Sequence, residues 1–210
     1  MPKQTVDPPT TGSPTIESLR PPTALHDVAA EHLQVIHRTV AGAATFRGTS
    51  GWVTAGLGVV ALVVSALTWR LPAEEWLTWW AILGPIAFAI GAVGVIAKTR
   101  GSTQPLWGPA GRRFLLGLLP SLAAGAVLSL VLLRLGHIEL LPGVWLLTFG
   151  LGITACGLAS TRIVPAMGIS FLLLAPLALF EPSWGRALLA IGFGGFQLMF
   201  GVLIARQHGG

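Results

Sequence analysis

Six long apolar stretches without a single charged side chain dominate this sequence. They are residues 52–69, 77–97, 114–133, 142–158, 163–180 and 187–205. About 20 helical residues are needed to cross the ~30 Å hydrocarbon core of a bilayer, and each stretch comes close to that length. The pattern predicts an all-α fold, a polytopic transmembrane bundle of six helices.

The overall composition supports a membrane setting. Of the 210 residues, 53% are hydrophobic and 10% are charged, and the mean hydropathy is +0.74. Soluble domains carry about 25% charged residues, so a soluble core could not bury this much apolar surface. The net charge of +5 does not indicate a nucleic-acid partner, because the basic residues are scattered over the predicted loops. They fit topology signals and contacts to the anionic headgroups of a lipid bilayer.

Three regions follow from the order of the stretches. Residues 1–23 are polar and rich in proline, and we expect a disordered cytoplasmic tail because such a segment buries little apolar surface. Residues 24–50 are predicted to form a juxtamembrane amphipathic helix and a joint, and residues 51–210 the six-helix transmembrane domain. No apolar signal-peptide core lies in the tail, so the first span is expected to act as an uncleaved insertion signal.

The amphipathic segment has one apolar face. Its members recur at helical spacing and are Leu25, Leu33, Ile36 and Val40. An interfacial helix that lies flat on the membrane explains this face. The alternative is a docking face for a cytoplasmic protein partner or for a second subunit.

Loop charge predicts the orientation of the spans. Ten of the thirteen Lys and Arg residues lie on the same side as the N-terminus, and the other side holds Arg70, Arg134 and Arg186. Because positive loops stay in the cytoplasm, both termini are predicted to be cytoplasmic. The three loops on the opposite side each contain Arg, Glu, Pro and Trp, which suits interfacial turns but is also compatible with a hairpin unit used three times.

Small residues mark the predicted helix-packing faces. The third span carries four of them at strict four-residue spacing, Gly117, Ser121, Gly125 and Ser129. Helices in membranes associate largely through close contact at such stripes, so a packing face is favoured over a ligand groove. Gly91 in the second span and Gly194 and Gly195 in the sixth are assigned the same role. The fourth span is short and rich in glycine, and is expected to be the least stable helix by itself.

Four further residues are candidates for a solute contact or for a polar contact between helices. Three are prolines inside spans, and the fourth is the amide of the last span: Pro85, Pro120, Pro176 and Gln197. Proline frees a backbone carbonyl, and such carbonyls can line a substrate site. A hydrogen bond from Gln197 to a neighbouring helix is the simpler expectation, because an unpaired amide in hydrocarbon is costly.

The residue types needed for catalysis are missing from the spans. They contain no His, Asp or Glu, and their single cysteine, Cys156, cannot form an intramolecular disulfide. The spacing of His26, His32 and His37 does not stack these side chains on one helical face, so it does not fit a zinc site. We therefore expect no enzyme activity, no catalytic residue, no metal and no cofactor.

Several short segments resemble a group of uncharacterised bacterial six-span integral membrane proteins that has no assigned activity. These segments are residues 36–40, 46–52, 142–147, 164–168, 192–195 and 204–210. The resemblance extends from about residue 24 to the end. It implies a multi-pass protein of the bacterial cytoplasmic (inner) membrane, and it implies no catalytic residue.

Two classes of function fit these observations. The leading one is a non-enzymatic structural or regulatory membrane component that acts through a protein partner or as a homo-oligomer. The alternative is a small transporter or channel for a neutral or apolar solute. An intramembrane enzyme is disfavoured because the spans offer no acid–base pair.

Overall fold

The computed structural model describes residues 50–100, 109–157 and 162–208. All of them belong to one compact unit, Gly42–Gly210. The predicted tail, the amphipathic segment with Leu25, Leu33, Ile36 and Val40, and the joint lie outside the described residues.

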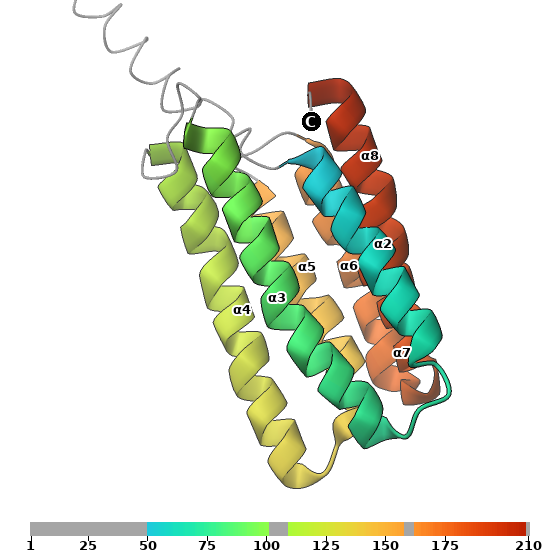
Figure 1. The fold of residues 1–210 in the computed structure, drawn as a ribbon. Coiled ribbons are helices and arrows are strands. Elements are labelled where there is room, and N and C mark those ends of the chain that lie inside the picture. The colour runs from blue at the N-terminus through green and yellow to red at the C-terminus, as the bar shows by residue number, and fades with distance from the viewer. Residues whose placement is uncertain (1–49, 101–108, 158–161, 209–210) are drawn as a thin grey trace, which may run out of the picture. The chain divides into compact units, whose positions relative to one another are not determined.

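The described part of the chain is helical and contains no strand, so the all-α prediction is confirmed (Figure 1). Its helices are α2 (Gly51–Leu67), α3 (Ala73–Arg100), α4 (Pro109–Leu135), α5 (Leu141–Gly157), α6 (Ile163–Phe180), α7 (Gly185–Leu189), the π-helical segment η4 (Ala190–Phe196) and α8 (Gln197–His208). The last three run on from one another without a break. Two short 3₁₀ turns, η2 (Ile138–Leu140) and η3 (Pro182–Trp184), precede α5 and α7.

Five helical stretches are long and apolar enough to cross a membrane. They are Ala73–Ala97, Arg112–Leu135, Ile138–Gly157, Ile163–Phe180 and Pro182–Gln207. The remaining helix, α2, has 17 residues and is shorter. The second to the sixth predicted spans therefore have the expected length and composition. The first predicted span, residues 52–69, stays a prediction.

Neighbouring helices alternate in direction, which gives the bundle two distinct ends (Figure 1). The turn end holds the connections α2–α3, α4–α5 and α6–α7. The terminal end holds the start of α2 and the end of α8. Arg70, Arg134 and Arg186 belong to the turn end, whereas Arg112, Arg113, Arg162 and Arg206 belong to the terminal end.

Helix α5 lies at the centre of the packing, between α4 and α6. Eleven of its residues are buried, and four of these are glycines to which a neighbouring helix comes close. A Cβ at Gly150, for example, would lie 3.0 Å from the Gly168 carbonyl oxygen. The sequence predicts α5 to be the weakest helix by itself. The structure shows that its glycines are used for close contact, which makes α5 the most buried helix of the set.

A second close pair joins α2 to α8, which are far apart in sequence. A Cβ at Gly58 would lie 2.5 Å from the Leu198 backbone nitrogen, and Gly51 and Gly201 meet the backbone of the opposite helix in the same way. Contacts through backbone atoms leave no side chain that could move aside. The two helices are therefore held at a fixed, short separation.

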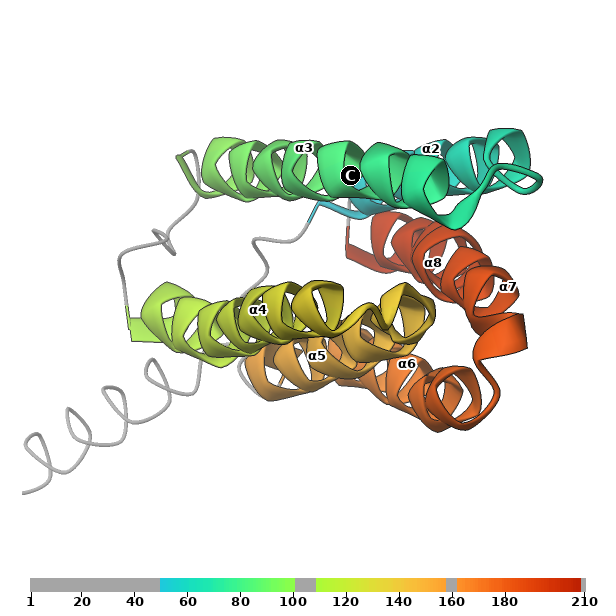
Figure 2. The ribbon, with the colours of Figure 1, turned by 90° about the horizontal axis from the view of Figure 1, so that it is seen from below.

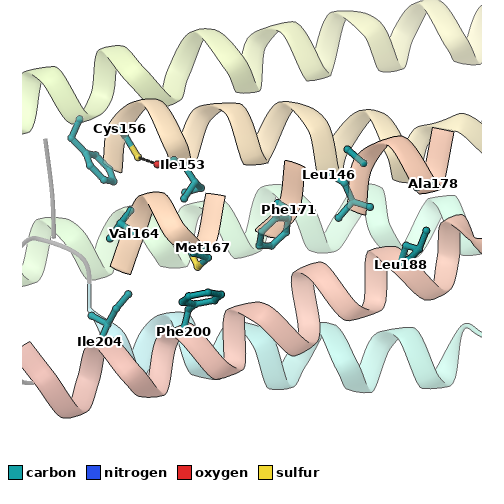
Figure 3. Packing of buried hydrophobic residues seen from close by; sticks show 12 residues of the cluster. Leu146, Ile153, Cys156, Val164, Met167, Phe171, Ala178, Leu188, Phe200 and Ile204 are labelled. Carbon is teal, nitrogen blue, oxygen red and sulfur yellow. Dashed lines mark hydrogen bonds between the residues drawn. The ribbon is translucent and has the colours of Figure 1, made fainter. Parts of the chain in front are cut away.

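An apolar core joins α5 and α6 to the last helix, which consists of α7, η4 and α8 (Figure 3). Phe171 and Leu146 are fully buried in it, and Met167, Phe200 and Ile204 face one another from α6 and α8. The Phe171 ring lies 5.0 Å from Phe149 and 5.2 Å from Phe193 between ring centroids. Aromatic contact thus connects all three helices.

Helix α3 is the exception to this close packing. From residue 73 to residue 97, Trp76 is the one buried residue. Its more extensive contacts are with α2 and with η2, and it lies beside α2 in Figure 2. Most of its long apolar surface is therefore free of protein contact.

Candidate functional site

Arg186 organises the turn end of the bundle. Its guanidinium donates a hydrogen bond to the Leu71 carbonyl oxygen at 2.8 Å and a longer one to the Trp69 carbonyl oxygen at 3.5 Å. The same group lies 5.3 Å from the centre of the Trp76 ring, within cation–π range. Since Arg186 starts α7, these contacts join the first turn to the third.

The second turn carries an exposed ion pair. His137 Nδ1 lies 3.1 Å from Glu139 Oε1, and both side chains are about half exposed. The backbone N–H of Glu139, followed by the hydrogen bond from His137, lowers the pKa of the Glu139 carboxyl. Glu181 accepts a hydrogen bond from Ser183 at 2.5 Å in the third turn. These contacts close turns and present no buried nucleophile or acid–base pair.

The predicted stripe on α4 lies against α5. A Cβ at Gly117 would be 2.7 Å from the Cys156 backbone nitrogen, and one at Gly125 would be 2.7 Å from Thr148 Oγ1. The Ser121 Cβ is close to Gly152 of α5. Ser129 donates its hydroxyl hydrogen to the Gly125 carbonyl oxygen at 2.7 Å.

The other three predicted packing glycines have different surroundings. Gly194 faces Leu62 of α2 closely, whereas the atom nearest to a Cβ at Gly91 would be Leu57 Cδ1, at 3.9 Å. Gly195 departs from the expectation, since a Cβ there would meet nothing within 4 Å. It follows the exposed Ile191 by about one turn, so it lies on the outward side of the last helix.

Sequence reasoning missed Gly58, which makes one of the closest contacts in the bundle. A signal was present, because Gly51, Ala55 and Gly58 recur at helical spacing in the first span. That stripe is interrupted by larger residues and was less regular than the one in α4.

The three prolines do not form one site with Gln197. Pro85, Pro120 and Pro176 lie in three different helices, and each is exposed, whereas Gln197 is 9% exposed. The three prolines therefore lie on outer faces of their helices, apart from the buried Gln197. A solute contact or an interhelical polar contact at any of these four residues stays a prediction.

Gln197 differs from the other polar residues of the helices. Eight hydroxyl side chains of the described residues donate to the carbonyl four residues earlier, Thr54, Ser65, Thr68, Thr78, Ser129, Thr148, Thr154 and Ser170. Gln197 is 9% exposed, and the bond from its amide to a neighbouring helix stays a prediction. Among the fully buried side-chain polar atoms of the described residues, the Trp80 indole nitrogen, which sequence reasoning did not single out, is the one without a hydrogen-bond partner.

The described residues contain no group of three or more His, Cys, Asp or Glu side chains that could hold a metal ion. Cys156 is buried and free, and its thiol lies 3.4 Å from the Ile153 carbonyl oxygen. The fold thus defines an all-helical protein with five helices suited to a membrane. Comparisons with protein-family models, curated proteins and solved structures found no match to this chain.

Proposed function

We propose that this chain is a non-catalytic membrane component, structural or regulatory, that acts by binding a protein partner through α3. The observation that carries this proposal is the packing of α3. Helices α2, α5 and α8 make glycine-mediated contacts with their neighbours, but α3 is held mainly near its two ends.

The contacts at both ends of α3 are specific. At the turn end Trp76 is buried under Arg186, and toward the terminal end Val53 of α2 packs 3.2 Å from the position of a Cβ at Gly94. Between these contacts, large apolar side chains remain exposed: Ile82, Ile86, Phe88, Ile90 and Val93. Such a helix can accept a transmembrane helix of another protein without disturbing the rest of the bundle.

Charge adds to this argument. At the terminal end the described residues include four arginines, Arg112, Arg113, Arg162 and Arg206, whereas the four described glutamates all lie at the turn end. With the predicted orientation, the terminal end faces the cytoplasm of a bacterial inner membrane. A partner with an acidic cytoplasmic segment next to its membrane helix would complement both surfaces.

Photo-crosslinking in the native membrane tests this proposal. A benzophenone amino acid at Ile86 of α3 is expected to give a discrete protein adduct. The matched control is the same amino acid at Leu173 of α6, which is also exposed and apolar, and it is expected to give none. An adduct of twice the mass would identify a second copy of the chain as the partner. Adducts to lipid alone at both positions would contradict the proposal.

The second candidate function is a carrier or channel for a neutral or apolar solute. One observation favours it, the position of Gln197, a polar residue that is only 9% exposed within the last helix. Uptake of solute into vesicles containing the purified protein would separate it from the first proposal.

A further inference from the structure

The face of α3 that is turned toward the bundle is only partly covered by it. The residues of this inner face recur at helical spacing and are Trp76, Trp80, Leu83, Ala87, Gly91 and Gly94. Trp76 is buried, whereas the five residues that follow it are all partly exposed. The nearest neighbour of a Cβ at Gly91 would be Leu57 Cδ1, at 3.9 Å. The middle of α3 is therefore accessible on its inner face as well as on its outer one.

Three aromatic rings from three helices continue this accessible region into the bundle. Trp80 of α3 packs edge-on against Phe193 of the last helix, with 6.4 Å between ring centroids. Phe193 in turn lies 4.8 Å from Phe149 of α5. All three side chains are partly exposed, although Phe149 belongs to the most buried helix. We call these three rings the aromatic surface.

Helix α4 lies next to the aromatic surface on the side away from α3. A Cβ at Gly125 of α4 would be 2.7 Å from Oγ1 of Thr148, the residue directly before Phe149. Helices α3 and α4 themselves lie apart (Figure 2), and they are the two least buried of the five stretches that could cross a membrane. The aromatic surface is thus flanked by two helices that face mostly away from protein.

The chemistry of this region selects an apolar occupant. Residues 77–97 of α3, 114–133 of α4 and 142–157 of α5 contain no Asp, Glu, Lys, Arg or His. Aromatic and aliphatic side chains gain free energy when apolar groups cover them. In a bilayer, the hydrocarbon chains of lipids are the groups that meet such a surface at this depth.

Charge at the terminal end selects the kind of lipid. Arg112 and Arg113 lie near the start of α4, both are exposed, and the described residues of this end include no acid. Guanidinium groups bind phosphate oxygens with two parallel hydrogen bonds, which favours a lipid phosphate as their partner. A headgroup with a net negative charge fits this end better than a neutral one.

The distances along α4 agree with the length of a lipid chain. Gly125 follows Arg113 by twelve residues, which is roughly 18 Å at the helical rise of 1.5 Å per residue. One leaflet contributes about 15 Å, half of the ~30 Å hydrocarbon core. A lipid whose phosphate lies at Arg112 and Arg113 therefore has its chain ends near the level of Gly125 and Phe149.

We propose that an acyl chain of an anionic phospholipid covers the aromatic surface between α3 and α4, with its phosphate held by Arg112 and Arg113. The interaction is non-covalent. It uses the inner face of α3, so it does not depend on the partner proposed for the outer face.

Photo-crosslinking lipids test this proposal with the full chain in phosphatidylcholine vesicles. The probe is a phosphatidylglycerol that carries a diazirine near the end of one acyl chain. Mass spectrometry is expected to place its adducts on the residues around Phe149 and Phe193. A phosphatidylcholine with the same diazirine chain is the matched control and should label these residues much less.

Two pairs of variants separate the contributions of charge and space. Replacing Arg112 and Arg113 with glutamine should lower labelling by phosphatidylglycerol about fivefold for each arginine, whereas Arg134→Gln at the other end of α4 should leave it unchanged. Ala87→Leu fills the inner face of α3 and should also lower labelling. Ala89→Leu, at an exposed position of the same helix, is its control.

Three results would overturn the proposal. Equal labelling of the aromatic surface by both lipids would show that the arginines select nothing. Equal labelling of the aromatic surface and of outward residues such as Leu128 and Leu130 would show bulk lipid only. Absence of adducts around Phe149 and Phe193 with either probe would show that lipid does not reach the aromatic surface.

Discussion

At the scale of single residues, the arginine near the start of α7 and the glycines between α2 and α8 join parts of the chain that are far apart in sequence. Arg186 connects two turns that are 115 residues apart in the chain, through the Leu71 carbonyl oxygen. Gly58 allows the backbones of two helices to touch.

Replacing Arg186 with glutamine should separate the first turn from the third. The variant loses a charged hydrogen bond at 2.8 Å and the contact with the Trp76 ring. We expect the free energy of unfolding to fall by about 1–2 kcal/mol, because the site is only partly buried. Thermal unfolding in detergent measures this. Arg134→Gln, at an exposed position at the same end, is the control, and an equal loss in both variants would refute the assigned role.

Two glycines on α2 provide a matched pair. Gly58→Ala places a methyl group 2.5 Å from the Leu198 backbone nitrogen and should destabilise the protein by about 1–3 kcal/mol. Gly56→Ala adds the same methyl group where nothing lies within 4 Å, and should be neutral or slightly stabilising, by up to about 1 kcal/mol. Melting temperatures in one detergent decide the order. Similar values would mean that α2 and α8 are not in backbone contact.

At the scale of helices, the bundle contrasts a buried, glycine-rich α5 with a peripheral α3. Helix α5 packs on both α4 and α6, and most of its side chains are buried. Helix α3 is longer, but its extensive contacts are limited to α2 and η2. Helix length therefore does not indicate which helix is central, because burial is decided by how closely neighbours can approach.

This contrast predicts a difference in mobility. Spin labels at the exposed positions Val93 of α3 and Leu128 of α4 should give a broad distance distribution by pulsed electron spin resonance. Labels at Leu151 of α5 and Leu173 of α6, also exposed, should give a narrow one, because these two helices pack together along their length. Both pairs are introduced with Cys156 replaced by alanine. Equal widths would show that α3 is held as firmly as the central helices.

At the scale of the whole molecule, the distribution of charge predicts the orientation in the membrane. The turn end combines Arg70, Arg134 and Arg186 with the four described glutamates, and the terminal end carries arginines without a described acid. The terminal end is therefore the more positive one, and positive segments remain in the cytoplasm.

Reporter fusions test this orientation. Alkaline phosphatase, which is active only in the periplasm, should be inactive when fused after residue 210. The same enzyme inserted between residues 71 and 75 of the first turn should be active. The reverse pattern would invert the proposed orientation. It would place the terminal end, with Arg112, Arg113, Arg162 and Arg206, on the periplasmic side.

The sequence by itself determined the helical class and most of the helix boundaries. Helix formation in an apolar solvent depends on local composition and length, so charge-free stretches such as residues 163–180 predicted α6 to the residue. The stripe on α4 was also visible, because its four-residue spacing is a local property. The same local reasoning singled out Gln197 as an unusual polar residue.

Only the tertiary structure decided which faces meet. The close approach of Gly58 to Leu198 joins residues that are 140 positions apart, and no local pattern indicates that α2 would lie beside α8. The outward position of Gly195, the central position of α5 and the burial of the Trp80 N–H beside Phe193 depend likewise on the arrangement of several helices. In lipid, apolar faces are nearly equivalent to the solvent, so hydrophobicity selects the helices, whereas shape and close contact select their neighbours.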